Sequence, residues 1–331
     1  MVTKTTGLIT QTINFGDQAE KLNITLLAGG ISAEREVSLQ TGKQIAAALR
    51  RCGHFVFESD VGPDNLSALD HKPCDLVFPA LHGTFGEDGR LQAILEKRGI
   101  PFVGSDSAAS HLAMDKLAVK KILVDRDVPT PVWQVVRQSE FTPHWEPVEA
   151  VGLPCVIKPN ADGSSVACRI CHSLSEARGH LSATLPKYGQ MLVERWIKGP
   201  ELTVGIIDDH PLPIIQIRPS TEFYDYQAKY VREDTQYLFN IDLPETVLYD
   251  VSNAALRTYH WVGARHLARV DIMLDQASLQ PMVLEINTMP GFTTHSLVPK
   301  AAEHAGITFD QLCDRLARLA LRDAPVNVPS H

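Results

Sequence analysis

Apolar and polar residues alternate in two neighbouring stretches near the end of the chain, as is typical of β-strands that bury one face. The stretches are residues 269–274 (RVDIML) and 282–287, and a short polar turn joins them. If they form a hairpin, three oxygen ligands and one guanidinium share one side: Asp271, Glu285, Asn287 and Arg269. Hard divalent cations prefer such oxygen ligands, so the pattern indicates a metal site. A solvated hairpin face is the simpler alternative, because single carboxylates in strands are usually exposed.

The N-terminal third predicts a small open α/β sheet, because short apolar runs alternate there with helical stretches. A first strand is expected at residues 23–28, and a helix from residue 33 to residue 52. Ser32 is expected to cap this helix. Glu34 would lie in its first turn, where it either complements the helix dipole or faces a cleft and holds a cation. Further strands are expected at residues 55–58, 75–79 and 101–103, and a helix at residues 90–98.

The rest of the chain continues as a mixture of helices and strands. Helices are expected around residues 114–116, at 248–267 and at 309–322, and strands at 132–136, 153–159, 191–194 and in two runs between 202 and 217. The fold class is therefore α/β (α+β). The expected parts are a polar extension (1–21), an N-terminal α/β domain (22–104), a central subdomain (105–193), a C-terminal subdomain (194–323) and a tail that frays (324–331).

Composition narrows the function classes. A chain of 331 residues with 44% hydrophobic and 21% charged residues suits a soluble globular protein of two or three domains. The net charge of −8 gives no general attraction to nucleic acid or to an anionic membrane, so any phosphate site must be built locally. Because no signal peptide and no bilayer-spanning apolar run is found, the expected location is the cytoplasm.

The six cysteines are expected to be reduced thiols in that compartment. One pair needs separate consideration, because Cys168, Cys171 and His172 spell the CxxCH pattern of haem attachment. The same run is interpreted as a strand, in which a separation of three residues sends the two sulfurs to opposite faces. We therefore expect the pattern to be coincidental.

Several loops carry candidate ligand-binding groups at strand ends, where open α/β sheets bind ligands. His82 ends one strand and precedes a glycine-rich loop. Lys158 ends another strand before an Asn-Ala-Asp-Gly-Ser-Ser loop, which offers a fixed cation with backbone and hydroxyl donors for a triphosphate. The P-loop and dinucleotide fingerprints are absent, which weakens the reading as a Rossmann dehydrogenase. Glu194 and Glu201 either accept hydrogen bonds from adenine and ribose or are simply exposed.

A polar, aromatic stretch at residues 223–230 (FYDYQAKY) ends in Lys229 and Tyr230. Aromatic density in a loop favours a lid that excludes water from a reactive intermediate.

Seven segments, in this order and at this spacing, resemble the D-alanine–D-alanine ligases of the ATP-grasp superfamily across residues 24–319. They are residues 28–39 (AGGISAEREVSL), 80–89 (ALHGTFGEDG), 114–116 (MDK), 156–166 (VIKPNADGSSV), 223–230, 269–274 and 284–299 (LEINTMPGFTTHSLVP). The resemblance implies an ATP-grasp fold, in which the N-terminal α/β domain and two α+β domains enclose the nucleotide. It also implies ATP-dependent joining of two D-alanines through a D-alanyl phosphate, for peptidoglycan precursor synthesis.

The resemblance further implies a role for each matching residue. Lys116 and Lys158 would hold the α- and β-phosphates and Lys229 the γ-phosphate. Glu194 would meet the adenine and Glu201 the ribose. The same ATP site would include Ser165, Arg195, Trp196 and Ile197. Asp271, Glu285 and Asn287 would bind two Mg²⁺ ions, for which Mn²⁺ can substitute, with Glu285 bridging them.

For the amino-acid substrates, Glu34 would pair with the ammonium of the first D-alanine, and His82 would lie near its carboxylate. Arg269 and the Gly291 N–H would stabilise the oxyanion of the tetrahedral intermediate. The remaining residues implied by the resemblance are Ser296 and Leu297 on the second D-alanine, and Ser164 and Tyr230 in a hydrogen-bonded link to Glu34 that closes the lid.

In the family, tyrosine at the Tyr230 position accompanies D-alanine as acceptor and phenylalanine accompanies D-lactate, so Tyr230 favours the dipeptide. Ala167 and Met289 depart from the commoner glycine and serine at their positions, but neither change removes a charged or liganding group. A homodimer is expected from the family. The competing interpretations are a D-alanine–D-lactate ligase, another carboxylate–amine ligase and a nucleotide-binding protein without catalysis.

Overall fold

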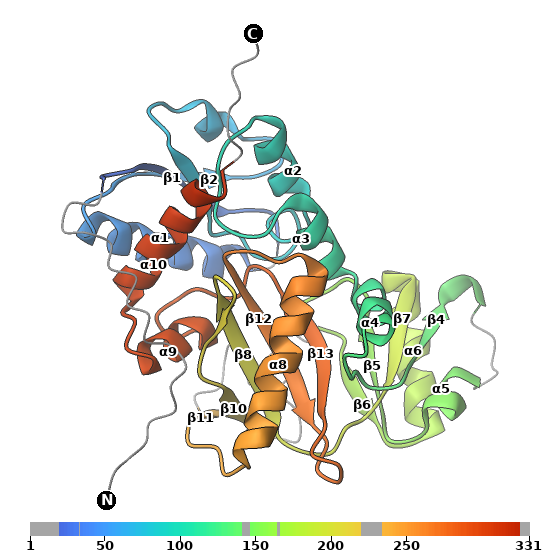
Figure 1. Cartoon of the computed structure of the whole chain (residues 1–331). Coiled ribbons are helices and arrows are strands. Elements are labelled where there is room, and N and C mark those ends of the chain that lie inside the picture. The colour runs from blue at the N-terminus through green and yellow to red at the C-terminus, as the bar shows by residue number, and fades with distance from the viewer. Residues whose placement is uncertain (1–19, 33, 141–145, 164–165, 220–233, 325–331) are drawn as a thin grey trace, which may run out of the picture.

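A computed structural model describes residues 20–32, 34–140, 146–163, 166–219 and 234–324. This part of the chain forms three β-sheets, each with its own helices (Figure 1). The N-terminal sheet is parallel and has the order β2-β1-β3. Its elements are β1 (Asn23–Gly29), α1 (Arg35–Arg51), β2 (Phe55–Val61), β3 (Leu76–Pro79) and α2 (Arg90–Lys97). A parallel sheet places the carboxyl ends of all its strands at one edge, and the loops after β1 and β3 meet there.

The central sheet is antiparallel and has the order β4-β7-β5-β6. Its elements are β4 (Trp133–Arg137), α5 (Glu146–Val151), β5 (Cys155–Pro159), β6 (Arg169–Cys171), α6 (Leu174–Tyr188) and β7 (Gln190–Arg195). The helices α5 and α6 contribute Val148, Leu181 and Leu185 to the apolar core on one face of this sheet. Its other face is therefore available to line a site.

The C-terminal sheet has six strands in the order β11-β10-β8-β12-β13, with β9 paired to β8. Its elements are β8 (Glu201–Ile207), β9 (His210–Pro211), β10 (Ile215–Arg218), β11 (Gln236–Leu238), α8 (Glu245–Val262), β12 (Leu267–Leu274) and β13 (Pro281–Asn287). Helix α8 lies across strands β8, β12 and β13 (Figure 1). Helices α3 (Ser107–Met114) and α4 (Lys116–Asp125) join α8 in the same core.

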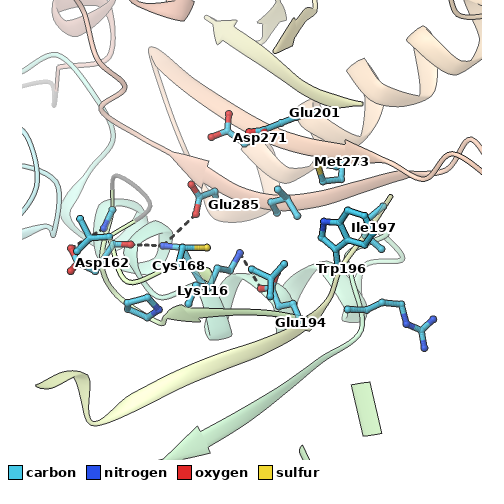
Figure 2. A pocket seen from close by; sticks show the side chains of 17 residues that line it. Lys116, Asp162, Cys168, Glu194, Trp196, Ile197, Glu201, Asp271, Met273 and Glu285 are labelled. Carbon is cyan, nitrogen blue, oxygen red and sulfur yellow. Dashed lines mark hydrogen bonds and ion pairs between the residues drawn. The ribbon is translucent and has the colours of Figure 1, made fainter. Parts of the chain in front are cut away.

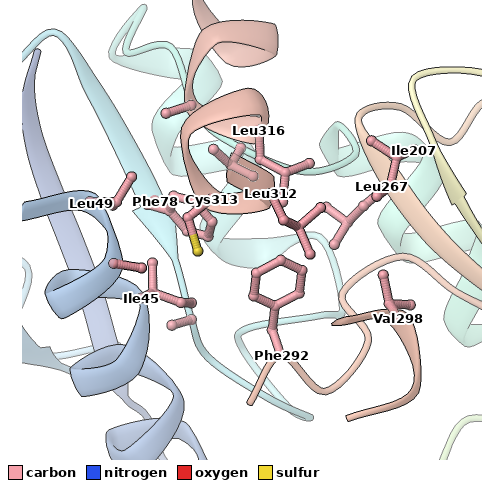
Figure 3. Packing of buried hydrophobic residues seen from close by; sticks show 14 of the residues in the cluster. Ile45, Leu49, Phe78, Ile207, Leu267, Phe292, Val298, Leu312, Cys313 and Leu316 are labelled. Atoms are coloured by element: carbon pink, nitrogen blue, oxygen red, sulfur yellow. The ribbon is translucent and has the colours of Figure 1, made fainter. Parts of the chain in front are cut away.

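The last two helices tie the C-terminal sheet to the N-terminal domain. Helices α9 (Leu297–His304) and α10 (Phe309–Arg322) share one core with β1, β3 and α1, as the packing of Ile45, Phe78 and Leu312 illustrates (Figure 3). Two polar contacts reinforce it, since Arg51 pairs with Asp310 through two hydrogen bonds and the buried His54 Nε2 lies 2.8 Å from Asp314. The N-terminal domain thus packs directly on the end of the chain.

The hairpin predicted from alternation is confirmed, because β12 and β13 pair antiparallel with Asp271 opposite Glu285 and Arg269 opposite Asn287. The last helix is confirmed at Phe309–Arg322. The helix expected at residues 248–267 begins at Glu245 and ends at Val262, because Gly263 adopts φ 77° and the chain then enters β12.

Several predictions of helix and strand boundaries and of helix caps were wrong. The helix expected around residues 114–116 is two helices, because Asp115 is extended and its carboxylate caps α4 at the Ala118 N–H. Ser32 is not the cap of α1, because the helix begins only at Arg35; its hydroxyl accepts from the Glu34 N–H and donates to the carbonyl of His82. Glu34 occupies the N-cap position, one residue before the first turn. The strand expected at residues 101–103 is a single bridge between Phe102 and Val77.

Within the residues described, no helix is both long and apolar enough to cross a membrane.

Candidate functional site

The nucleotide-binding residues expected from the sequence line one pocket between the central and C-terminal sheets (Figure 2). Those that do so are Lys116, Lys158, Glu194, Arg195, Trp196, Ile197, Glu201, Asp271 and Glu285. Figure 2 shows Asp271, Glu201 and Glu285 on the strands of the C-terminal sheet, facing Lys116, Cys168 and Glu194 across the pocket. Ser164, Ser165, Lys229 and Tyr230 lie outside the described residues.

Apolar side chains complete this pocket, and sequence reasoning had not singled them out. They are Val156, Val166, Met273 and Leu284, with the Cys168 thiol. The alternation within residues 153–159 could have found Val156, because it shares a strand face with Lys158. Flat apolar walls beside a few polar groups are typical of sites for an aromatic ring.

The position of Lys116 follows from the break between α3 and α4. The Asn160 side chain, in the loop after β5, contacts Asp115 and accepts from the Leu117 N–H, so it fixes the start of α4 to that loop. The Lys116 ammonium then donates to the carbonyl of Asp162 at 2.8 Å and lies 3.4 Å from Glu285 Oε2. One lysine therefore bridges the two sheets at the floor of the pocket.

Lys158 and Glu194 form a buried ion pair at 3.1 Å, so the alternative that Glu194 is simply exposed was wrong. Burial lowers the pKa of Lys158, but the charges of Glu194 and Glu285 outweigh it and the net change is upward. Burial raises the pKa of Glu194, and the two nearby lysines, Lys120 and Lys158, reverse this to a net decrease. Both groups are therefore charged at neutral pH.

The shared face of β12 and β13 gathers the expected metal ligands, and they are already engaged in hydrogen bonds. Arg269 makes a two-pronged contact with Asp271, with Nε to Oδ1 at 2.9 Å and Nη2 to Oδ2 at 2.8 Å. Thr203 on β8 donates to Asp271 Oδ1 at 2.7 Å, and Asn287 Oδ1 accepts from the Met289 N–H at 2.9 Å. Thr203 had not been singled out from the sequence, because only the register of β8 with β12 brings it there.

This donor set fits a hard divalent cation. Asp271 and Glu285 are directly opposite on adjacent strands, so their side chains lie within reach of one ion, and both offer carboxylate oxygens. Among the described residues no cluster of three or more histidine, cysteine or acidic side chains gathers at one point. Two carboxylates and one amide therefore make an incomplete shell, of the kind that magnesium completes with phosphate oxygens and water.

A second cleft, of about 550 Å³, adjoins the nucleotide pocket and shares Lys116, Asp162, Gly163 and Glu285 with it. The substrate-binding residues expected from the sequence line it: Glu34, His82, Arg269, Gly291, Ser296 and Leu297. Asn287 does so as well, which places the expected metal ligands between the two cavities. The cleft brings together the N-terminal domain and the C-terminal sheet.

His82 lies at the carboxyl end of β3, where it is only 5% exposed. Its Nδ1 lies 3.3 Å from Glu87 Oε1, and its Nε2 lies 3.4 Å from Thr41 Oγ1. Burial alone lowers the pKa of His82, but the hydrogen bond and charge of Glu87, with a contribution from Glu34, raise it overall. A protonated imidazole in this cleft suits an anionic ligand. Glu87 had been overlooked, although it belongs to the glycine-rich loop that follows His82.

Glu34 enters the same cleft from the N-terminus of α1. Gly83 permits this approach, since a Cβ there would lie 3.2 Å from Glu34 Oε2 and 3.0 Å from the Ser32 Cβ, and its φ is +68°. The two glycine-containing loops after β1 and β3 therefore pack closely at the sheet edge. Glu34 and His82 are held by adjacent strand ends, as expected of a ligand site in an open α/β sheet.

Ser296 and Leu297 lie at the start of α9, a helix that was not predicted from the sequence. Ser296 is the N-cap residue, and its Oγ accepts from the Thr293 N–H at 3.0 Å. The first backbone N–H groups of a helix lack intrahelical partners and attract anions, so this end suits a carboxylate. Gly291 lies close by, because a Cβ there would approach Ser296 Oγ to 3.2 Å.

Cys168 and Cys171 point to opposite faces of the central sheet, as expected. Cys168 lines the nucleotide pocket, and Cys171 is buried in the core against Cys155 on β5. The six cysteines, all within the described part of the chain, are free thiols.

Comparison with known proteins agrees with this geometry. Residues 56–105 match a family model described as "D-ala D-ala ligase N-terminus", and residues 122–318 match one described as "D-ala D-ala ligase C-terminus". The chain is 42% identical over 306 residues to a D-alanine–D-alanine ligase from Syntrophotalea carbinolica, covering 92% of this chain and 98% of the relative.

Solved structures give the same picture. The D-alanine–D-alanine ligase from Bacillus anthracis complexed with ATP superposes with a TM-score of 0.79 at 33% identity, covering 91% of this chain and 98% of that one. The VanG D-Ala:D-Ser ligase from Enterococcus faecalis superposes with a TM-score of 0.80 at 25% identity, covering 91% and 100%. Because ligases with different acceptors share this fold, the acceptor must be read from the site and not from the fold alone.

Proposed function

Since this chain belongs to the D-alanine–D-alanine ligase family, we infer that it joins two D-alanine molecules into D-alanyl-D-alanine in a reaction driven by ATP. The product serves peptidoglycan precursor synthesis. The observation that carries this inference is the junction of two cavities, because the nucleotide pocket and the second cleft, which holds the expected substrate-binding residues, meet at Lys116 and Glu285. A γ-phosphate at that junction would lie next to a carboxylate substrate.

We propose that Asp271, Glu285 and Asn287 hold two Mg²⁺ ions, with Glu285 shared between them and Mn²⁺ as a substitute. When bound, the ions would neutralise the phosphate oxygens that a carboxylate must approach. Lys116 and Lys158 supply further positive charge to the phosphates from the opposite wall, and their burial strengthens that attraction. Lys229, which lies outside the described residues, is the proposed partner of the γ-phosphate.

The base and ribose are proposed to occupy the far end of the pocket. Val156, Leu284 and Met273 offer apolar surface to the adenine ring, with Trp196 and Ile197 beside them. Arg195 and Ser165 are assigned to the same ATP site. Glu194 is proposed to accept from the adenine amine and Glu201 from the ribose hydroxyls.

In the first half-reaction, a carboxylate oxygen of the first D-alanine bonds to the γ-phosphorus, and the bond from that phosphorus to ADP breaks. Glu34 is proposed to hold the ammonium of this substrate, and His82 to lie near its carboxylate. The pKa of His82 is raised by Glu87, which favours the protonated imidazole and supports that assignment. The product is an acyl phosphate, which water would hydrolyse if the cleft stayed open.

In the second half-reaction, the neutral amine of the second D-alanine attacks the acyl carbon, phosphate leaves and the amine loses a proton. Arg269 and the Gly291 N–H are proposed to stabilise the oxyanion that forms in between. Ser296 and Leu297 at the start of α9 are proposed to hold the carboxylate of this second substrate. Ser164 and Tyr230 are proposed to link to Glu34 and close the site.

We further propose that the enzyme is a homodimer in the cytoplasm. Cytoplasmic action is supported by its use of ATP and by six cysteines that remain free thiols.

Phosphate release from ATP tests the proposal when D-alanine, D-serine, D-lactate and L-alanine are supplied in parallel with Mg²⁺. Release only with D-alanine, and a dipeptide found by mass spectrometry, is the expected result. In mixtures of D-alanine with D-lactate or with D-serine, a depsipeptide or a D-alanyl-D-serine product in at least the yield of the dipeptide would change the assigned acceptor. Omitting Mg²⁺ and then adding Mn²⁺ tests the metal, and full activity in a chelator would refute that assignment.

A further inference from the structure

Lys120 is a charged side chain that lies behind the wall of the nucleotide pocket, and the mechanism above does not use it. Lys120 on α4 is fully buried, and its ammonium lies 3.2 Å from Glu194 Oε1. The Lys158 ammonium lies 3.1 Å from the same oxygen. Glu194 is thus held between two ammonium groups, of which only Lys158 lines the pocket. Glu194 itself is at the wall in Figure 2.

The position of Lys120 is fixed independently of the nucleotide. Its ammonium donates to Thr130 Oγ1 at 2.7 Å, and that hydroxyl donates to the carbonyl of Val283 at 2.7 Å. Val283 is on β13, two residues before Glu285, and its own N–H donates to the carbonyl of Pro129. Lys120 therefore connects α4 and β7 to the strand that carries a proposed metal ligand.

Burying an ammonium group costs free energy, and the ion pair with Glu194 offsets part of that cost for Lys120. Burial lowers the pKa of Lys120 to about 8, while the charge of Glu194 opposes that effect. An apolar side chain of similar length would fill the same space without the cost of removing a charge from water. A charge at this place therefore points to a role in orienting the carboxylate, which is at the pocket wall, and not only in packing.

We propose that Lys120 is a positioning residue for the nucleotide, which holds Glu194 Oε1 in place so that the other carboxylate oxygen faces the adenine amine. This inference rests on the proposed function, in which Glu194 recognises the base. Without Lys120, the Glu194 carboxylate would keep Lys158 as the one remaining cation of this pair of lysines and would turn toward it. That turn would weaken recognition of the base and draw Lys158 away from the phosphates.

The test compares ATP with ITP, which carries a 6-oxo group in place of the 6-amino group. In Lys120→Met, we expect the KM for ATP to rise about tenfold, as for a lost hydrogen bond to a charged group, with the KM for D-alanine unchanged. The preference for ATP over ITP, taken as the ratio of their kcat/KM values, should fall by a similar factor. A packing defect alone would weaken both nucleotides equally.

Lys121→Met is the matched control, because Lys121 is the next residue on α4 and is exposed. It removes the same charge by the same substitution, and its ATP-to-ITP preference should equal that of the wild type. An equal fall in this control would overturn the proposal, since it would show a general effect of charge.

Glu194→Gln separates the two levels of the argument. An amide can donate to the 6-oxo group, so this variant should lose most of the preference for ATP. If it does and Lys120→Met does not, the positioning role is wrong while the assignment of Glu194 stands. If neither variant changes the preference, the assignment of Glu194 to the base is wrong and the inference falls with it.

The double variant Lys120→Met/Glu194→Gln removes both buried charges, which guards against a single variant that fails to fold. If Lys120 acts through Glu194, the double variant should show the same ATP-to-ITP preference as Glu194→Gln. A further fall beyond that of Glu194→Gln would overturn the proposal.

Discussion

His266 should make the folded protein lose stability in mild acid, by an amount that the structure allows to be worked out. The imidazole is 2% exposed, its Nδ1 accepts from the Gly104 N–H at 3.0 Å, and its Nε2 lies 3.2 Å from Asp323 Oδ2. It thus joins the end of the N-terminal domain to the residue after α10. Burial, with the charge of Arg265, lowers the pKa of His266 to about 4, although Asp323 opposes this.

The folded-state pKa of His266 lies below its ordinary value of 6.5, so the neutral imidazole is the form that the fold favours. Its contribution is complete above pH 6.5 and is lost progressively as the pH falls towards 4. Each unit between the two pKa values corresponds to about 1.4 kcal/mol, which gives roughly 3 kcal/mol for the whole interval. Protonation would place a buried charge beside Arg265, which is the main origin of the loss, and a protonated Nδ1 could no longer accept from the Gly104 N–H.

His266→Asn isolates this contribution. Asparagine tolerates the positive φ of 63° at this position and offers an oxygen to the Gly104 N–H, but it does not titrate. Urea unfolding followed by circular dichroism at several pH values between 7 and 4 measures the free energy of unfolding. The advantage of the wild type over the variant should shrink by roughly 3 kcal/mol across that range. An advantage that stays constant with pH would refute the reasoning.

Three further predictions concern the chemistry. Glu285→Gln should lower turnover about a thousandfold with an unchanged circular dichroism spectrum, because it removes charge from the shared metal ligand; full turnover would contradict the metal assignment. Glu87→Gln should lower the pKa of His82, so that the rise in the KM for D-alanine with increasing pH begins at a pH roughly one unit lower than in the wild type. An unchanged dependence of KM on pH would show that Glu87 does not set the pKa of His82. Tyr230→Phe should increase depsipeptide formation from D-lactate, measured by mass spectrometry beside the dipeptide, and an unchanged product ratio would argue against the lid role.

The sequence alone predicted the elements whose structure is determined by the local pattern of residues. Alternation alone placed Asp271 and Glu285 on one face of a hairpin, because the period of a strand is fixed by its pleat. The last helix was placed correctly, since Thr308 and Gln311 form a capping box at its start and its apolar stripe is regular. The residues expected to bind substrate and nucleotide line two adjoining cavities wherever they are described.

The local sequence pattern did not predict the role of residues that contact partners distant in the sequence. Ser32 resembles a helix cap, but α1 begins only at Arg35, and the Ser32 hydroxyl donates a hydrogen bond to the carbonyl of His82 in the loop after β3. Asp115 ends one helix and caps the next through the Ala118 N–H, and Asn160, far along the chain, donates to the same carboxylate. Lys120 looks like an ordinary helical lysine until β7 brings Glu194 against it. Each of these depends on tertiary contacts, which periodicity does not contain.

The same dependence on tertiary contacts explains how an acidic chain builds a phosphate site. With a net charge of −8, the protein has no surplus of positive charge to attract a nucleotide from a distance. It instead pairs buried or half-buried cations of the site with carboxylates: Lys116 with Glu285, Arg269 with Asp271, and Lys158 with Glu194. Buried charges need such partners to persist in a folded protein. A metal–nucleotide complex carries charges of both signs, so under the proposed function its cations would take over Asp271 and Glu285 and its phosphates would take over Lys116 and Lys158. Glu194 would keep Lys120 as its partner and gain the adenine amine. Binding of the complex would therefore exchange one set of ion pairs for another, and no charge would need to be left unpaired within the site.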